Sequence, residues 1–337
     1  MRTAFGRTFD VPAGYLATAS VGVPPRETAD AVAAALQRWR TGAGRATEFD
    51  GVVARARAAF GALVGVGPER VALGGAVSPL VGLVAAAVPD GARVAVAEGE
   101  FSSVSYPFAV QGRGITVTEV PLEKLAEADA EVIACSVVQS LDGRMADLPA
   151  LRARREAGTT VVLDVTQAAG WMPLSLDWAD AVVGACYKWL FAPRGAAWMA
   201  VREGLELVPH AAGWWAAEDP WGSTTGLPPR LAADARRLDT SPAWYSHVGA
   251  AESLSWLAGQ DLERIRTHCV GLADRFRAGM GLEPAGSAIV HVRVSEAAQR
   301  LAAAGVTATA RGGGARLAFA LYSTPDDVDR ALTALSG

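Results

Sequence analysis

Apolar residues recur every three or four positions along several stretches of the chain, and this spacing predicts amphipathic helices. Short runs of apolar and β-branched residues separate many of these stretches and predict strands. The predicted helices cover residues 26–40, 50–64, 79–88, 147–157, 244–258, 261–280, 295–304 and 325–335. The predicted strands cover residues 71–73, 93–97, 115–120, 132–135, 160–165, 181–184, 196–201, 288–294 and 316–321.

The order of these elements predicts an α/β fold. The first seven strands are continuously apolar, which is typical of a mostly parallel sheet with helices on both faces. From about residue 287 the order changes to strand, helix, strand, helix, which indicates a smaller α+β unit. We therefore expect a large α/β domain over residues 20–240 and a small domain built from residues 1–19 and 241–337. The stretch 213–229, rich in Pro, Gly and Trp, is predicted to be a loop.

Composition narrows the class of protein. The 337 residues carry a formal charge of −4, which gives no electrostatic reason to expect nucleic acid or an anionic membrane as partner. The chain has no apolar run of about 18 residues, and its N-terminus lacks the apolar core of a signal peptide. Its three cysteines and four histidines form no metal-ligand pattern, so neither a disulfide framework nor a metal site is expected. These features predict a reduced, cytoplasmic, globular protein.

Lysine is almost absent from the chain. Of 31 basic residues only Lys124 and Lys188 are lysines, and arginine supplies the other cations. Lys124 lies in the charged segment PLEKLAEADAE, where a surface position is expected. Lys188 lies between two apolar runs. A lysine amine can act as a nucleophile, which arginine cannot do at neutral pH, so Lys188 is a candidate catalytic residue.

Asp164 ends the apolar strand 160–165, and Lys188 follows the next predicted strand. In an open parallel sheet, ligands bind at the carboxyl ends of the strands, so these two side chains can converge on one ligand. From spacing alone, a helix-capping aspartate and a surface lysine explain the pattern equally well.

A glycine-containing turn follows the strand 71–73. Gly74 and Gly75 precede a predicted helix in which Ser78 is the expected N-cap and Pro79 the first residue. Such a turn lets backbone N–H groups approach a phosphate, although the signal is weak on its own. Neither GxGxxG nor GxxxxGK[ST] is present, which disfavours dinucleotide and P-loop sites. A phosphate cradle, an acid and an amine nucleophile together indicate pyridoxal 5′-phosphate (PLP).

The chain resembles the class V aminotransferase family of fold-type I PLP-dependent enzymes, which includes cysteine desulfurases, kynureninases and isopenicillin N epimerase-like proteins. The combination of LDVTQ with YKWL-x-x-P-x-G is the most specific part of the resemblance. The matching segments, in order, are YLATASVG, GGAVSP, EGEFSSVSYPF, SVVQSLDG, LDVTQAAG, YKWLFAPRG, RRLDTSPAW and RLAFALYSTPDDVD. The resemblance implies a seven-stranded, mostly parallel sheet and a small C-terminal domain.

The resemblance also implies roles around the cofactor ring. Lys188 would form the Schiff base with PLP and later carry the Cα proton. Asp164 would keep the pyridine nitrogen protonated, which makes the ring an electron sink. Gln167 matches a residue near the ring hydroxyl, and Ser140 stands where relatives often carry Asn. Phe101 matches a ring-stacking aromatic of kynureninase-like members, with ordinary core packing as the alternative.

For the phosphate, the resemblance implies contacts with the backbone of Gly75, Ala76 and Val77 and with the Tyr187 hydroxyl. Relatives often carry Ser and His just before the lysine, and this chain departs from that pattern. Ser241 matches a hydroxyl that the partner subunit supplies in the family, which implies a homodimer with shared active sites.

For the substrate, Arg316 matches the arginine that binds the α-carboxylate of the amino acid. Tyr15 and Trp244 are candidates for lining the substrate pocket, together with the tryptophans of the stretch 213–229. Packing in the core or at an interface explains these aromatic residues equally well. Trp39 and Trp256 are predicted to be core residues because they lie at helical spacing with other apolar positions.

The sequence lacks a cysteine that one of the family's reactions requires. Cysteine desulfurases of the family need a mobile cysteine just before the arginine strand, and residues 309–315 read TARGGGA. We therefore exclude desulfurase and expect an aminotransferase, with a β-eliminating carbon–sulfur lyase or an epimerase as the alternative. A non-catalytic binding protein is the alternative from another class, and the joint presence of Lys188, Asp164, Gln167 and Arg316 disfavours it.

Overall fold

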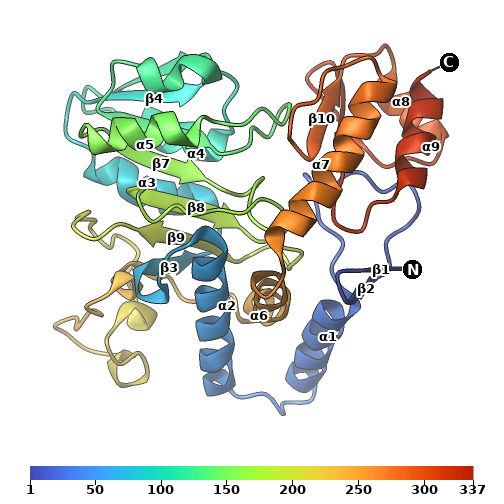
Figure 1. Cartoon of the computed structure of the whole chain (residues 1–337). Helices are drawn as coiled ribbons and strands as arrows, with labels where there is room; N and C mark the ends of the chain where they lie inside the picture. The colour runs from blue at the N-terminus through green and yellow to red at the C-terminus, as the bar shows by residue number, and fades with distance from the viewer. Residues whose placement is uncertain (337) are drawn as a thin grey trace.

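A seven-stranded sheet forms the centre of the larger part of the molecule in the computed structural model, which describes residues 1–336 (Figure 1). Its strands are β3 (Val71–Gly74), β4 (Arg93–Ala97), β5 (Thr116–Val120), β6 (Val132–Ser136), β7 (Thr160–Asp164), β8 (Ala181–Ala185) and β9 (Ala197–Val201). The order is β3-β9-β8-β7-β6-β4-β5, with β9 antiparallel to both of its neighbours and the pairs from β8 to β5 parallel. The mostly parallel sheet expected from the sequence is confirmed.

Helices cover both faces of this sheet because successive strand residues point to opposite sides. In β7, Val161 and Leu163 belong to one apolar cluster and Val162 to another. The first cluster contains residues of α2 (Phe49–Val64), α5 (Leu148–Glu156) and α6 (Trp244–Ala258). The second contains residues of α3 (Val77–Ala87) and α4 (Ser102–Ala109). The site must therefore lie at the ends of the strands.

The C-terminal part is built on a small antiparallel sheet of order β10-β12-β11. Its elements are β10 (Ile289–Val292), β11 (Thr309–Arg311), β12 (Gly314–Ala318), α7 (Leu262–Gly279), α8 (Ala297–Ala303) and α9 (Pro325–Leu335). Phe276 of α7, Leu317 of β12 and Val328 of α9 share its apolar core. The N-terminal hairpin of β1 (Arg2–Ala4) and β2 (Arg7–Phe9) lies beside this part (Figure 1).

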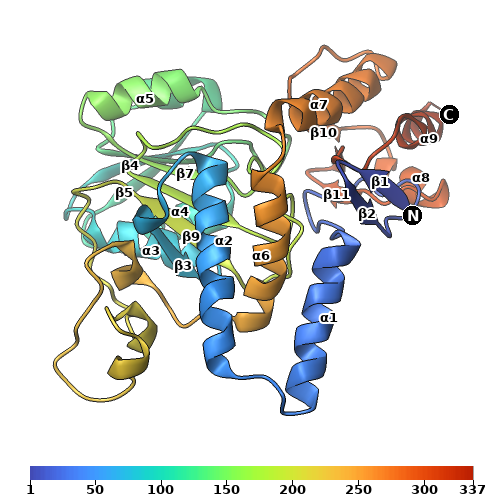
Figure 2. The ribbon, with the colours of Figure 1, turned by 60° about the horizontal axis from the view of Figure 1, so that its bottom comes forward.

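Three helices stand side by side along one edge of the molecule. Figures 1 and 2 show α1 (Arg26–Arg40), α6 and α2 in this arrangement, with α6 in contact with both others. Of the residues of α1, only Thr28 is buried, so this helix leaves most of its surface exposed. Because α6 packs on helices of the larger part, the chain beyond residue 240 returns to it before reaching α7. The domain boundary at residue 240 stays a prediction.

The structure corrects several local predictions. Helix α3 begins at Val77 with Ala76 as its N-cap and no side-chain cap, so Ser78 is not the N-cap. Helix α4 was not predicted, since Pro107 and polar residues interrupt its apolar pattern. Strand β5 is an edge strand with exposed residues rather than a strand covered on both faces. Trp39 is 66% exposed at the end of α1 and is not a core residue, whereas Trp256 is buried.

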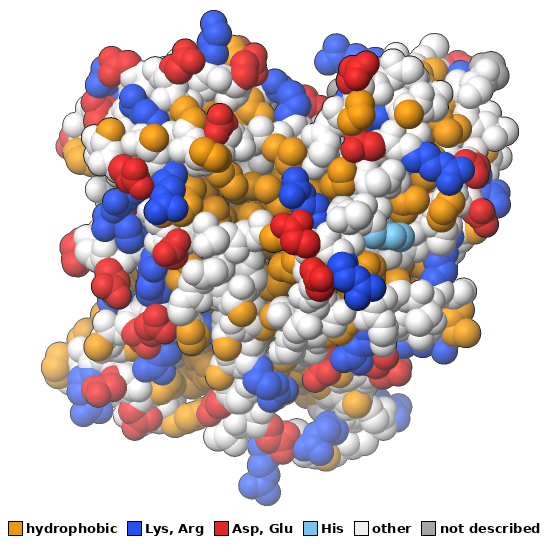
Figure 3. Space-filling view, viewed as in Figure 1, with side chains coloured by type: hydrophobic (Ala, Val, Ile, Leu, Met, Phe, Trp, Pro, Cys, Tyr) orange, Lys and Arg blue, Asp and Glu red, His pale blue; other side chains and the backbone are white. Residues whose placement is uncertain are grey.

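The surface carries charges of both signs. Figure 3 shows basic and acidic side chains interspersed over one face of the molecule. Within residues 1–336, no helix is long and apolar enough to span a membrane. The stretch 213–229 is a loop with two short 3-10 turns, as predicted.

Candidate active site

Two adjoining cavities lie at the carboxyl ends of the central strands. The inner cavity, of about 130 Å³, is lined from the β3–α3 turn, from the end of β7 and from the segment after β8. The outer cavity, of about 680 Å³, opens from it toward α1 and the C-terminal part. Both are lined by Phe101, Ser140, Tyr187, Lys188 and Arg194. The edge of the sheet at which the sequence predicts a ligand site is therefore hollow.

Lys188 and Asp164 line the inner cavity from two neighbouring strand ends. Strand β7 ends at Asp164 and pairs in parallel with β8, and Lys188 lies three residues beyond β8. Both side chains are buried, at 5% and 4% exposure. Burial lowers the pKa of Lys188 to about 8, against the attraction of Asp164, which raises it. Near neutral pH, part of the amine is therefore the neutral, nucleophilic form.

The environment of Asp164 favours an ionised carboxylate only in part. Burial raises its pKa to about 6, while the hydrogen bond that the Thr166 N–H donates to Oδ1, at 2.7 Å, lowers it. The positive charge of Lys188 also lowers this pKa, and the negative charge of Glu100 raises it. A cationic group placed against Asp164 would stabilise the ionised form of its carboxylate.

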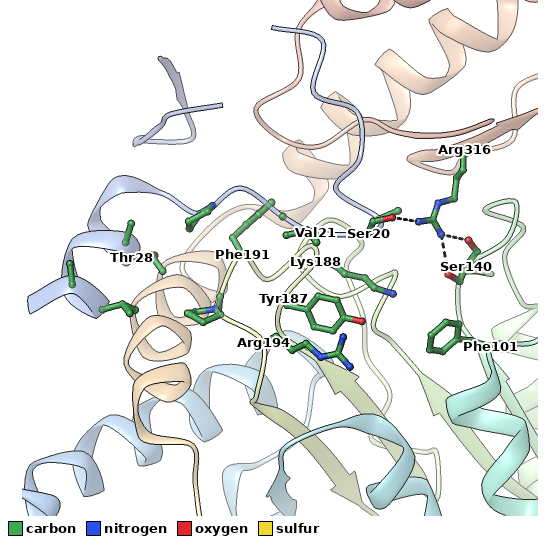
Figure 4. A pocket seen from close by; sticks show the side chains of 18 of the residues that line it. Ser20, Val21, Thr28, Phe101, Ser140, Tyr187, Lys188, Phe191, Arg194 and Arg316 are labelled. Carbon is green, nitrogen blue, oxygen red and sulfur yellow. Dashed lines mark hydrogen bonds between the residues drawn. The ribbon is translucent and has the colours of Figure 1, made fainter. Parts of the chain in front are cut away.

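Two aromatic rings and the amine of Lys188 face one space. The Lys188 amine lies 5.3 Å from the centre of the Phe101 ring and 5.6 Å from that of Tyr187. Figure 4 shows the amine, the Tyr187 hydroxyl and the Phe101 ring directed toward this space. Phe101 stands at the start of α4 and is half-buried, so its ring is a wall of the site rather than core.

Gln167 is held by hydrogen bonds with four other residues, three of them distant in the sequence. Its Nε2 donates to the Ala19 carbonyl at 3.0 Å and to Ser140 Oγ at 3.1 Å. Its Oε1 accepts from Trp189 Nε1 at 2.8 Å, and its carbonyl accepts from Trp171. This network fixes the amide and Ser140 at the boundary between the two cavities.

Arg316 projects from β12 into the outer cavity. It is 2% exposed, and it donates to the Ser140 carbonyl, to Ser140 Oγ at 3.1 Å and to Ser20 Oγ at 2.7 Å (Figure 4). Its Nε is buried without a hydrogen-bond partner. Burial lowers the pKa of Arg316 to about 10. No carboxylate within residues 1–336 pairs with this buried guanidinium, which suits it to bind an anion from solution.

The start of α3 offers backbone donors to the inner cavity. Gly75, Ala76 and Val77 line the cavity, and no side chain caps the helix. The first N–H groups of a helix lack partners within the helix and carry partial positive charge. An anion at this point of the cavity would satisfy them.

Three of the predicted site residues lie outside both cavities of this chain. The Tyr15 hydroxyl donates to the Val21 carbonyl at 2.8 Å, which holds the N-terminal segment. Trp244 stacks on Phe49 at 4.9 Å between ring centres, at the start of α6. Ser241 is exposed and lines neither cavity. The tryptophans of 213–229 pack on one another and line neither cavity.

The structure adds residues that the sequence analysis missed. Glu100 accepts hydrogen bonds from the backbone N–H of Phe101 and Ser136 and from the Gln139 amide, which fixes Phe101. Arg194 lines both cavities, with its guanidinium 5.1 Å from the Tyr187 ring centre. Arg311 lines the outer cavity. The position of Arg194 within YKWLFAPRG was a signal for the site, but the many arginines of the chain concealed Arg311.

Three curated proteins are similar in sequence to this chain, which matches no family profile. The uncharacterised aminotransferase YcbU of Bacillus subtilis is 28% identical over 306 residues, which cover 82% of this chain and 81% of that protein. A kynureninase of Salinispora tropica is 28% identical over 248 residues, 61% of this chain and 57% of that protein. An isopenicillin N epimerase of Streptomyces clavuligerus is 28% identical over 246 residues, 63% and 58% of the two chains. The names of these relatives all indicate the class V aminotransferase family of PLP-dependent enzymes.

Solved structures confirm the fold-type I architecture of this chain. The cysteine desulfurase CsdA of Escherichia coli superposes with a TM-score of 0.82 at 18% identity, over 97% of this chain and 96% of that one. A cystine C–S lyase, C-DES, superposes with a TM-score of 0.82 at 17% identity, over 97% and 98%. At these identities the superpositions establish the fold and leave the reaction open.

The inner cavity fits PLP on the chemistry of its donor set. A buried amine faces a buried carboxylate, an aromatic ring forms a wall and an uncapped helix start supplies phosphate donors. These features occur together in the inner cavity, beside the end of β7 and the segment after β8. The expected site residues other than Tyr15, Trp244 and Ser241 all line one of the two cavities.

Proposed function

We propose that this protein is a PLP-dependent aminotransferase that acts on an α-amino acid. The observation that carries the proposal is a buried amine of lowered pKa, Lys188, in one cavity with the buried carboxylate of Asp164. The uncharacterised aminotransferase YcbU, which matches 82% of this chain, supports transamination among the reactions of these relatives.

The residues of the inner cavity would divide the binding of the cofactor. When bound, PLP supplies an aldehyde and an electron-accepting ring. Lys188 Nζ would hold the aldehyde carbon and, once the substrate amine takes its place, move a proton at the substrate Cα. Asp164 would hold a proton on the ring nitrogen, and the aromatic face of Phe101 would exclude water from one side. Gln167 would position the ring from the network that it forms with Ser140.

The phosphate would bind at the start of α3. The backbone of Gly75, Ala76 and Val77 supplies N–H donors there, and the Tyr187 hydroxyl lies in the same cavity. Arg194 extends from the segment after Lys188 and adds positive charge. We propose that Ser241 of a second subunit completes this end, which makes the enzyme a homodimer; its cytoplasmic location likewise stays a prediction.

Arg316 would bind the α-carboxylate of the substrate. A guanidinium presents two parallel N–H donors, which match the two oxygens of a carboxylate. The Ser20 and Ser140 hydroxyls hold Arg316 in place, so a bound substrate would be oriented with its Cα toward Lys188. Productive orientation of this kind is a large part of the rate acceleration in enzymes.

The three cysteines give no support to a desulfurase reaction. Cys135, Cys186 and Cys269 are all 0% exposed, and burial raises the pKa of the Cys186 thiol to about 12. A buried, protonated thiol is a poor nucleophile. Carbon–sulfur lysis by β-elimination and epimerisation need no such cysteine, and they are the alternatives that the experiment below must separate.

An amino-acid panel tests the proposal. Holoenzyme is incubated with ¹⁵N-labelled amino acids and an unlabelled 2-oxo acid, and the products are followed by mass spectrometry, with Lys188→Arg as control. Transfer of ¹⁵N to the oxo acid supports the proposal. Release of pyruvate and ammonia would identify a lyase, and solvent deuterium at Cα without net conversion would identify an epimerase. Failure to bind PLP at all would favour a non-catalytic protein.

A further inference from the structure

The outer cavity is strongly cationic. Lys188, Arg194, Arg311 and Arg316 line it, and no Asp or Glu of the described chain does. The rest of its wall is largely apolar and includes Val32 and Leu36 of α1 and Phe191. Unpaired cations beside apolar side chains are costly, so such a cavity favours anionic ligands. Its excess of positive charge is larger than a single α-carboxylate needs.

Arg311 and Arg316 point to the same side of the small sheet. In the pairing of β11 with β12, Arg311 lies opposite Gly314 and Thr309 lies opposite Arg316. Opposite residues of an antiparallel pair share a face, and so do residues two apart on one strand. The face that presents Arg316 to the cavity therefore presents Arg311 as well.

The Arg311 guanidinium has no partner within residues 1–336. The backbone carbonyl of Arg311 accepts a hydrogen bond from His291 at 2.8 Å, but the guanidinium forms neither an ion pair nor a hydrogen bond with the described residues. After burial, repulsion from Arg311 is the next cause that lowers the pKa of Arg316, which indicates that the two cations are close. Arg194 differs, because it also lines the inner cavity and lies over Tyr187. Arg311 lines only the outer cavity.

We propose that the substrate is a dicarboxylic amino acid and that Arg311 binds its side-chain carboxylate while Arg316 binds its α-carboxylate. This inference rests on the proposed function and names the substrate class of the same site. Two guanidinium groups on one face would hold the two ends of the substrate, and the short turn at Gly312 and Gly313 fixes the position of Arg311 relative to Arg316. Arg311 would then determine specificity without contact with the reacting atoms.

Binding of unreactive acids tests the inference without catalysis. The affinities of succinate, glutarate and adipate for holoenzyme are compared by calorimetry with those of monocarboxylates of equal chain length. We expect the best dicarboxylate to bind about 10- to 100-fold more tightly than the matching monocarboxylate. One charge-assisted hydrogen-bonded pair contributes a difference of this size. Arg311→Gln should abolish this difference, and Arg311→Lys should retain part of it. Arg293→Gln removes an exposed arginine near the end of β10 and should change nothing.

Steady-state kinetics provides the second measurement. Arg311→Gln should lower kcat/KM for glutamate or aspartate about 10- to 100-fold and leave alanine within about threefold. Equal loss for both classes of donor, or equal affinity for mono- and dicarboxylates in the unaltered enzyme, would overturn the inference. Transfer from neutral donors without any preference for diacids would overturn it while the proposed function stands. Preferential binding of diacids by a protein that transfers no amino group would retain Arg311 as their binding residue and overturn the proposed function.

Discussion

Lys188 differs from an exposed lysine because its ammonium form has lost most of its contact with water. The resulting pKa of about 8 is well below the ordinary value of 10.5, and the attraction of Asp164 offsets only part of the shift. The neutral amine is the nucleophile, so its fraction rises as pH increases through the pKa.

This shift predicts the pH dependence of cofactor attachment. The rate at which PLP attaches to apoprotein should rise with pH through a midpoint near 8 and level off above it, as followed by visible absorbance. Asp164→Asn removes the attraction that favours the ammonium form and should move the midpoint to lower pH. A midpoint near 10.5 that Asp164→Asn leaves unchanged would contradict the account.

At the scale of single residues, the sequence predicted which residues are reactive more reliably than it predicted where side chains lie. Lys188 and Asp164 could be predicted because lysine is rare in this chain and strand ends are recognisable. Tyr15 and Trp244 could not be placed, since an aromatic side chain carries no signal for which cavity it faces. Arg311 was concealed because only the three-dimensional structure tells which arginine lacks an acidic partner.

The segment that precedes α1 is packed tightly against the lysine. The Gly22 N–H donates to the Tyr187 carbonyl at 2.9 Å, and a Cβ on Gly22 would lie 1.9 Å from the Lys188 carbonyl oxygen. Gly22→Ala should therefore displace backbone, lower the free energy of unfolding by about 1–3 kcal/mol and weaken PLP binding. Urea unfolding and PLP titration measure the two effects.

Gly82 provides the matched control for that substitution. It lies within α3, where a Cβ would meet nothing within 4 Å. Gly82→Ala should raise the free energy of unfolding by about 0.5–1 kcal/mol through helix propensity. If Gly22→Ala and Gly82→Ala changed the free energy of unfolding and PLP binding alike, close packing at Gly22 would not explain the effect of Gly22→Ala.

A buried ion pair ties α2 to the segment that precedes α6. Arg57 donates to Asp239 at 2.5 Å and 3.1 Å, and Asp239 Oδ1 also accepts from the Leu73 N–H at 2.9 Å. Asp239→Ala leaves the Arg57 charge buried and unpaired, so urea unfolding should show a loss of about 3–5 kcal/mol. The double variant Arg57→Met with Asp239→Leu should recover part of the lost free energy of unfolding. If the double variant were as unstable as Asp239→Ala, the buried unpaired charge would not be the cause.

At the scale of elements, apolar periodicity predicted the helices and strands, and their ends were less certain. The bounds of α1 and α9 agree with the prediction because clear apolar repeats define them, and the bounds of α6 agree as well. Helix α4 was missed since it is short and contains Pro107. The start of α3 was misplaced because Ser78 resembles a cap, whereas the helix begins uncapped at the cavity.

At the scale of the whole molecule, an apolar face of α1 is exposed to solvent. Leu36 is 41% exposed on α1, on the face that lines the outer cavity, and Ser241 reaches no cavity of its own chain. A second copy of the chain would explain both observations. The sequence implied this association only through family resemblance, since exposure of a helix face depends on the tertiary structure.

Association is therefore predicted to depend on α1. Leu36→Asp places a charge in the apolar contact and should weaken dimerisation at least about tenfold, as measured by analytical ultracentrifugation over a range of protein concentrations. Ala34→Asp, at an exposed position outside both cavities, should leave the dimer intact. A wild-type protein that stays monomeric at every concentration would contradict the prediction.

The central claim is that the amine of Lys188 holds the cofactor aldehyde, and reduction with borohydride tests it most directly. Holoenzyme is reduced, digested and mapped by peptide mass spectrometry. The chain contains two lysines, so Lys124, which is exposed, is an internal control. The account predicts the mass of the reduced cofactor on the peptide with Lys188 and none on the peptide with Lys124. Reduced cofactor on Lys124, or on neither lysine, would contradict it.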